Sequence, residues 1–83
     1  MNLILFGTSA CHLCEMAHEL LIPLLKNHPS CQLEMIDIAE QTKWQEQYAI
    51  RIPVLLHPQT QQELSWPFDS AAIVKFINEL END

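Results

Sequence analysis

Short apolar runs predict four strands along the chain of 83 residues. Each run is bounded by polar or turn-forming residues, which is typical of buried strands. The predicted strands are Asn2–Phe6, Gln32–Asp37, Pro53–Leu56 and Gln62–Trp66. The third strand begins on a proline, a position where the missing N–H does not interrupt a ladder of hydrogen bonds.

Apolar residues spaced by three and four positions predict three helices. The first runs from Ala10 to Lys26, where Pro23 should kink the helix or end it early. The preceding loop, Thr8-Ser9-Ala10, has hydroxyls able to cap that helix. A short helix follows from about Ala39 to Tyr48, and the last helix has Asp69 as its predicted N-cap. The apolar stripe of the first helix comprises Leu13, Ala17, Leu20, Leu21, Leu24 and Leu25.

The resulting order βαβαββα predicts one α/β domain over residues 1–83. A helix between two strands implies that those strands are parallel and joined by a right-handed crossover. A single mixed four-stranded sheet with helices on both faces is the simplest arrangement of these elements.

The charge balance argues against nucleic acid as a partner. Four Lys and Arg residues against eleven Asp and Glu residues give a net charge of −7. Because phosphate backbones are bound by clustered basic residues, we expect no nucleic-acid partner.

No apolar segment is long enough to span a membrane, and the N-terminus does not resemble a signal peptide, so we expect a cytoplasmic protein.

The tetrad Cys11-His12-Leu13-Cys14 is the main candidate for chemistry. Two thiols three residues apart lie one helical turn apart, close enough to form a small disulfide. At a helix start, free backbone N–H groups and the positive end of the dipole stabilise a thiolate. A bridge across so short a loop adds little stability, so the pair indicates redox chemistry.

Two features together resemble the thioredoxin superfamily. The dithiol follows the first strand, and Ile52-Pro53 stands at the start of the third strand, where the superfamily carries a cis-proline. The length and helix count are most similar to the small glutaredoxin-like proteins, over essentially the whole chain. The resemblance implies a thioredoxin-like fold and thiol–disulfide exchange.

The resemblance also implies roles for individual residues. Cys11 would attack a substrate disulfide and Cys14 would resolve the mixed disulfide. Next to Pro53, the N–H and C=O of Ile52 would pair with an extended substrate. Arg51 is either a positive charge beside the site or a solvated arginine. His12 is either a protonated partner of the thiolate or an exposed residue of the first turn.

The expected substrates are protein or low-molecular-weight disulfides, handled by a monomer with no bound cofactor. Glutathione and a thioredoxin-type reductant are the two candidate electron donors. Glutaredoxins carry a Gly-Gly pair that helps hold glutathione, whereas this chain reads Trp66-Pro67-Phe68-Asp69 there and has one glycine, Gly7. The resemblance therefore supports the fold and the dithiol better than it supports glutathione.

Two alternatives to an enzyme stay open. The chain could be a non-catalytic interaction or redox-sensing module. It could also bind zinc, for which Cys11, Cys14, His28 and Cys31 supply ligand types, although structural zinc usually needs a second close pair of ligands. An iron–sulfur cluster bridged by cysteines between two protomers is the other metal alternative, because some glutaredoxins assemble one with glutathione. We expect no metal site.

Several residues near the dithiol have an expected structural role. We expect Cys31 to be a buried or half-buried free thiol without a partner. His18, four residues after Cys14, either lies beside it or is a partly exposed helix residue. Met16 and Met35 are expected to be packing residues.

Overall fold

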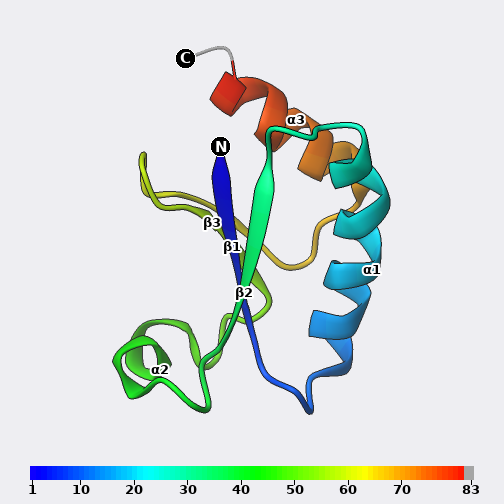
Figure 1. The fold of residues 1–83 in the computed structure, drawn as a ribbon. Coiled ribbons are helices and arrows are strands. Elements are labelled where there is room, and N and C mark those ends of the chain that lie inside the picture. The colour runs from blue at the N-terminus through cyan, green and yellow to red at the C-terminus, as the bar shows by residue number, and fades with distance from the viewer. Residues whose placement is uncertain (82–83) are drawn as a thin grey trace.

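The computed structural model describes residues 1–81 and contains three helices and four strands (Figure 1). The last two residues of the predicted domain, 82 and 83, lie outside the described part. The elements are β1 (Asn2–Gly7), α1 (His12–Lys26), β2 (Gln32–Asp37), α2 (Thr42–Tyr48), β3 (Val54–His57), β4 (Gln62–Ser65) and α3 (Ser70–Glu81). This order confirms the predicted βαβαββα arrangement.

The four strands form one mixed sheet in the order β2-β1-β3-β4. Strand β1 pairs with β2 in parallel, as expected for two strands joined through a helix. Strand β3 pairs in antiparallel with β1 and with β4. Strands β1 and β3 are thus the central strands of the sheet. Their sequences are continuous apolar runs rather than alternating ones, which is typical of strands whose two faces are both covered by helices.

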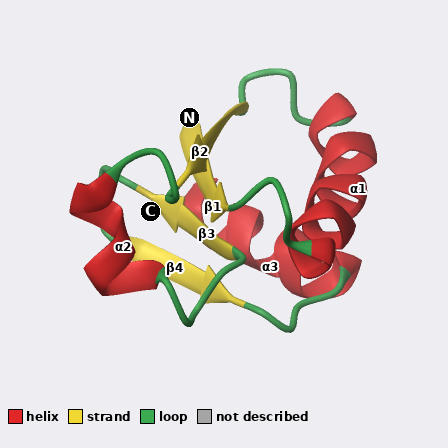
Figure 2. Ribbon diagram, turned by 90° about the horizontal axis from the view of Figure 1, so that it is seen from below, coloured by secondary structure: helices red, strands yellow, loops and turns green. Residues whose placement is uncertain are grey.

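Helices α1 and α3 cover one face of the sheet and α2 covers the other (Figure 2). Side chains of β1 alternate between the two faces, because successive residues of a strand point in opposite directions. Leu3 and Leu5 join α1 and α3 in the larger core cluster. Phe6 joins α2 in the smaller one, where it stacks on Tyr48 with a distance of 4.2 Å between ring centroids.

Several predictions about α1 differ from the structure. The helix begins at His12 rather than at Ala10, and its cap is Cys11 rather than a hydroxyl of the preceding loop. Pro23 does not end the helix, which continues to Lys26. Leu13 does not belong to the buried stripe and is 42% exposed, because Cys14 takes the inward position at the first turn.

Other boundaries differ by a few residues. Helix α2 begins at Thr42 rather than Ala39, because the chain first turns after β2, where Asp37 Oδ1 accepts a hydrogen bond from the Ala39 N–H at 2.9 Å. The cap of α3 is confirmed, since Asp69 Oδ1 accepts from the Ala72 N–H at 2.8 Å. None of the helices within residues 1–81 has the length and apolar character needed to cross a membrane.

Candidate redox site at the start of helix α1

The two sequence features that carry the resemblance lie at the same end of the sheet. Strand β1 ends at Gly7, and a short loop then leads to Cys11 at the start of α1. Phe6 of β1 pairs with Val54 of β3 in antiparallel register. Gly7 and Pro53, the next residues outward, therefore stand opposite one another beyond this pair.

Cys11 and Cys14 are joined in a disulfide, with their Cα atoms 5.2 Å apart. Cys11 is the N-cap residue of α1, and its Sγ accepts a hydrogen bond from the Cys14 backbone N–H at 3.2 Å. Cys14 is only 6% exposed, whereas Cys11 is half-buried. The more accessible sulfur is therefore the one that receives the N–H of the helix start, a position that favours a thiolate.

Gly7 makes room for the buried sulfur. A Cβ atom added at this position would lie 2.9 Å from Cys14 Sγ and 3.0 Å from Cys14 Cβ. Both distances are closer than normal contacts, and the short cysteine side chain cannot move away without displacing the helix start. The only glycine of the chain thus stands where the strand passes directly beneath the dithiol.

The Ile52–Pro53 peptide bond is cis, and the Pro53 ring is buried. The Pro53 carbonyl accepts a hydrogen bond from the Trp66 N–H at 3.2 Å. The Ile52 N–H donates to the Tyr48 carbonyl at 3.2 Å. In the free protein the Ile52 N–H is thus engaged by the end of α2, and pairing of Ile52 with a substrate stays a prediction.

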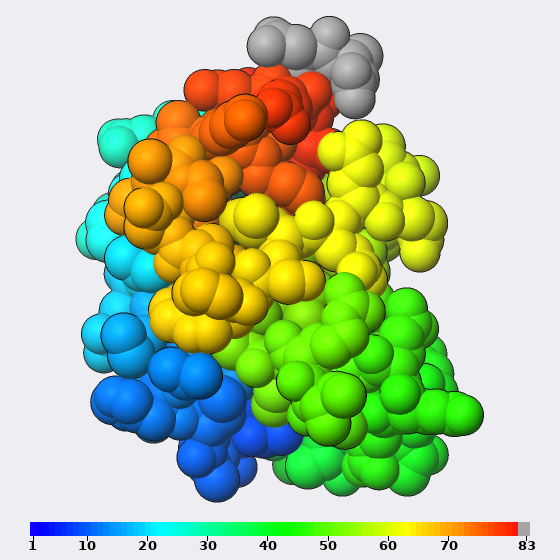
Figure 3. All heavy atoms as spheres, turned by 180° about the vertical axis from the view of Figure 1, so that it is seen from behind, coloured from blue at the N-terminus to red at the C-terminus, as the bar shows by residue number. Residues whose placement is uncertain are grey.

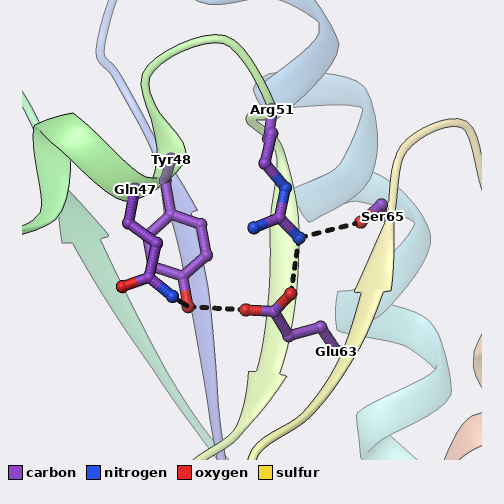
Figure 4. A network of polar contacts seen from close by, with 5 residues as sticks. All are labelled: Gln47, Tyr48, Arg51, Glu63 and Ser65. Carbon is purple, nitrogen blue, oxygen red and sulfur yellow. Dashed lines mark hydrogen bonds and ion pairs between the residues drawn. The ribbon is translucent and has the colours of Figure 1, made fainter.

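A polar network fastens the segment before Pro53 to strand β4 (Figure 4). Glu63 of β4 accepts a hydrogen bond from the Tyr48 hydroxyl at 2.6 Å and forms an ion pair with Arg51. The Arg51 guanidinium also lies over the Tyr48 ring, 5.3 Å from its centroid, and contacts Ser65. The positive charge of Arg51 is thus compensated by Glu63 of the same chain. The sequence alone left open whether Arg51 is a charge beside the site or a solvated arginine.

This network shifts the pKa values of Glu63 and Tyr48. Hydrogen bonds from Tyr48 and from Arg51 hold the pKa of Glu63 below its usual value of 4.5. Burial, together with the neighbouring Glu63 carboxylate, raises the pKa of Tyr48 from 10.0 to about 12. Both shifts show that the network is stable as a neutral tyrosine beside an ionised glutamate.

Exposed side chains surround the dithiol. His12 points to solvent, with its Nδ1 3.8 Å from a Glu15 carboxylate oxygen. Leu13 is partly exposed between the two cysteines, and Ile50 is 99% exposed in the segment that leads to Pro53. Seen from behind, the segments around residues 8–14, 50–53 and 66–70 border one another on this part of the surface (Figure 3).

A cavity of about 430 Å³ lies beside the buried cysteine. Cys14 and His18 of α1 both line it, so His18 does lie on the same side of the helix as Cys14. Met35 of β2 lines it as well and is 56% exposed, and Met16 is 40% exposed. The prediction that both methionines are packing residues is wrong, because Met35 lies on the edge strand β2 and Met16 on an exposed part of α1.

Cys31 lies apart from the dithiol, at the end of the sheet where β1 and β2 begin. It is a half-buried free thiol, as predicted, and its Sγ is 3.5 Å from Met1 Sδ. Burial raises the pKa of the Cys31 thiol above 9.0. Within residues 1–81, no three His, Cys, Asp or Glu side chains converge on a point where they could hold a metal ion.

The sequence did not single out Gly7 as a contact of the dithiol, nor Glu63 as the anchor of the Pro53 segment. The position of Gly7, directly before the dithiol loop, was a usable signal. Glu63 and Tyr48 are far apart in the sequence, and nothing in their spacing indicates that they meet. The cavity beside Cys14 likewise depends on how α1 lies against the edge strand.

A dithiol at the start of the first helix, on a four-stranded sheet that brings a cis-proline to the same end, defines a protein of the thioredoxin-like class. A family model for the glutaredoxin-like domain (DUF836) matches residues 2–78. The chain belongs to this glutaredoxin-like family. Fold and dithiol together support a redox role.

Solved structures confirm the thioredoxin-like fold. The X-ray structure of the structural-genomics target protein XcR50 from X. campestris is 28% identical, with a TM-score of 0.76 over 93% of this chain and 96% of that one. Its solution structure gives 29% identity and a TM-score of 0.74 over 95% of each chain.

Thioredoxin 1 from Thermosipho africanus shares the fold at 17% identity, with a TM-score of 0.72 over the whole of both chains. A comparison with curated proteins gives no match.

Proposed function

We propose that this protein is a thiol–disulfide oxidoreductase in which Cys11 attacks and Cys14 resolves. The observation that carries the proposal is the hydrogen bond from the Cys14 N–H to Cys11 Sγ, on the more exposed of the two sulfurs. In the reduced protein the same N–H and the helix dipole favour negative charge on Cys11. A thiolate, not a thiol, is the nucleophile of disulfide exchange.

The first step is attack by the Cys11 thiolate on one sulfur of a substrate disulfide. A bond forms between Cys11 Sγ and that sulfur, the substrate disulfide breaks, and its other sulfur leaves as a thiolate. The partly exposed Leu13 and the fully exposed Ile50 offer apolar surface on which a protein substrate can rest.

The second step is attack by the Cys14 thiolate on Cys11 Sγ. The Cys11–Cys14 disulfide forms, the mixed disulfide breaks, and the second substrate sulfur leaves as a thiolate. The substrate gains two electrons and the protein loses them. Because the Cα atoms of the two cysteines are 5.2 Å apart, a distance normal for a disulfide, this closure needs little movement of the helix.

The oxidised protein must then be reduced by a second dithiol or by two monothiols. We propose glutathione or a thioredoxin-type protein as this reductant. The substrates are protein or low-molecular-weight disulfides, the working form is a monomer, and the site of action is the cytoplasm. No cofactor takes part in either exchange step.

The experiment is a coupled turnover assay with a model disulfide and either glutathione with its reductase or thioredoxin reductase. Wild-type protein should turn over with at least one system. Cys11→Ser should abolish turnover, because the attacking sulfur is gone. Cys14→Ser should stop at the mixed disulfide, which mass spectrometry detects as an adduct on Cys11.

Two outcomes would contradict the assigned roles. The roles are wrong if Cys11→Ser keeps full activity, or if the adduct in Cys14→Ser forms on Cys31. The absence of turnover with both reductants and any disulfide would favour a non-catalytic module. Cys31→Ser is the matched control, since it removes a thiol at the other end of the sheet.

A further inference from the structure

The cavity beside Cys14 has an apolar interior that no side chain of the protein fills. Leu5 of β1 and Met35 of β2 supply apolar walls, and Gly7 contributes only backbone. Its volume of about 430 Å³ is enough for a long side chain or a small molecule. Met35 is 56% exposed, so its thioether side chain is accessible to a group that enters the cavity.

The same cavity is lined with negative charge. Glu15 and Glu19 reach it from α1, and Asp37 reaches it from the end of β2. Thr8, Ser9 and His18 are its other polar side chains, and neither lysine nor arginine is among the lining residues.

Within residues 1–81, no lysine or arginine pairs with any of these three carboxylates. Among the described residues, the one ion-pair partner of these carboxylates is His12, 3.8 Å from Glu15.

Two of the four lysine and arginine residues of the chain are held in ion pairs of their own. Arg51 pairs with Glu63 and Lys75 with Glu79, and neither borders the cavity. An arginine or lysine side chain matches this cavity, because it has an apolar stem and a cationic end. The stem would lie against Leu5 and Met35, and the charge would lie near Glu19 and Asp37.

We propose that this cavity binds a basic side chain of the protein whose disulfide is exchanged at Cys11. The identity of that partner rests on the proposed function, but the binding of a basic group does not. The loop residues Thr8 and Ser9, which lead to Cys11, line the cavity, so a segment attached to Cys11 can reach it.

A bound cation also acts on the second chemical step. The three carboxylates line the same cavity as Cys14, so their charge disfavours a negative charge on its sulfur, and a bound cation offsets them. The Cys14 thiolate then attacks Cys11 Sγ, the bond from Cys11 to the partner breaks, and the partner's sulfur leaves as a thiolate. The mixed disulfide of a basic partner is therefore resolved faster than that of a neutral one.

The binding test needs no redox chemistry. Blocked arginine and blocked citrulline, which has nearly the same shape without the charge, are titrated into the oxidised protein and followed by amide NMR shifts. Arginine should shift the signals of His18, Met35 and Asp37. Citrulline should bind about fivefold more weakly, the difference expected for two partly exposed ion pairs.

Paired variants identify the site. Glu19→Gln with Asp37→Asn should weaken arginine binding about fivefold and leave citrulline binding unchanged. The amide oxygen introduced at Asp37 still accepts the hydrogen bond from Ala39, so the turn is retained. Glu34→Gln with Glu46→Gln is the matched control, because it removes the same charge at exposed positions outside the cavity.

The proposal is overturned if arginine and citrulline bind alike, or if the control pair weakens arginine binding as much as the cavity pair. A second assay then tests the partner: disulfide peptides carrying arginine or citrulline are compared as substrates. The arginine peptide should react with about fivefold higher kcat/KM, and the cavity variant should remove this preference. If arginine binds but neither peptide turns over, the proposed function fails while the site stands.

Discussion

The two ends of strand β1 hold the cysteines of this chain in contrasting surroundings. At the Gly7 end, Cys11 caps α1 and its sulfur receives the N–H of Cys14 at 3.2 Å. At the other end, Cys31 is half-buried, and the contact of its sulfur is the thioether of Met1 at 3.5 Å. Burial raises the pKa of Cys31, mainly by removing water from around the charged form.

This contrast shows that the two ends offer a thiolate different surroundings: a backbone donor at the Gly7 end and, at the Cys31 end, a half-buried site without one in the described part of the chain. Both ends offer a cysteine next to a strand. Only the Gly7 end, within residues 1–81, combines a helix start, a second cysteine and a proline across the sheet. The most direct way to break the contrast is to disturb the Gly7 end.

Gly7→Ala should have the largest effect on stability. The added methyl group overlaps with Cys14, and an overpacked site of this kind costs about 1–3 kcal/mol. Urea unfolding of the oxidised protein measures the loss. In the background of Cys14→Ala, which removes the sulfur, the cost of Gly7→Ala should fall by about 1 kcal/mol. An unchanged cost would show that the crowding arises elsewhere.

Glu63→Gln should cost somewhat less, about 1–2 kcal/mol at pH 7, because charge-assisted hydrogen bonds to Tyr48 and Arg51 are lost. The folded pKa of Glu63 lies below 4.5, so its contribution is present above pH 4.5 and is lost as the pH falls through the folded value. The difference between wild type and variant should therefore shrink in acid. A difference that stays constant down to low pH would contradict the ion-pair account.

Tyr48→Phe should cost about 1 kcal/mol, since the hydroxyl no longer donates to Glu63 or accepts from Gln47 while the stacked ring remains. The pKa of Tyr48 is raised from 10.0 to about 12, so its contribution is complete below pH 10.0 and is lost as the pH rises towards 12. Wild type should lose stability in this range, and the variant should not. Equal alkaline profiles would show that Tyr48 ionises freely in the folded protein.

Cys31→Ser should have the smallest effect. The thiol makes one weak contact, so unfolding should change by less than about 1 kcal/mol, and disulfide turnover should be unchanged. A loss of turnover comparable to that of Cys11→Ser would move the chemistry to the other end of the sheet.

Much of the fold was predictable because it depends on local patterns. The apolar runs of β1 and β3 and the helical spacing in α1 and α3 determine which elements form, and the βαβ start determines that β1 and β2 are parallel. The boundary of α1 was not predictable from hydroxyl content, because a cysteine sulfur is its cap. Pro23 predicts a kink or an early end of the helix, and the early end is wrong: the leucines around Pro23 pack in the core and α1 continues to Lys26.

The site was predictable only in part. Two cysteines at this spacing after a strand predict a dithiol at the start of the first helix. The position of Pro53 was predictable because this residue stands at the start of the third predicted strand. The anchoring of Arg51 by Glu63, the engagement of the Ile52 N–H and the cavity at Met35 all depend on contacts between distant segments. Such contacts leave no periodic pattern in the sequence.

The central claim is that Cys11 carries the reactive thiolate, and the rate of alkylation of each cysteine tests it most directly. The reduced protein is treated with iodoacetamide at pH 7, and peptide mass spectrometry follows Cys11, Cys14 and Cys31 with time. Cys11 should react at least about tenfold faster than Cys31, because its sulfur is the more readily ionised. Faster modification of Cys14 or Cys31 would contradict the account.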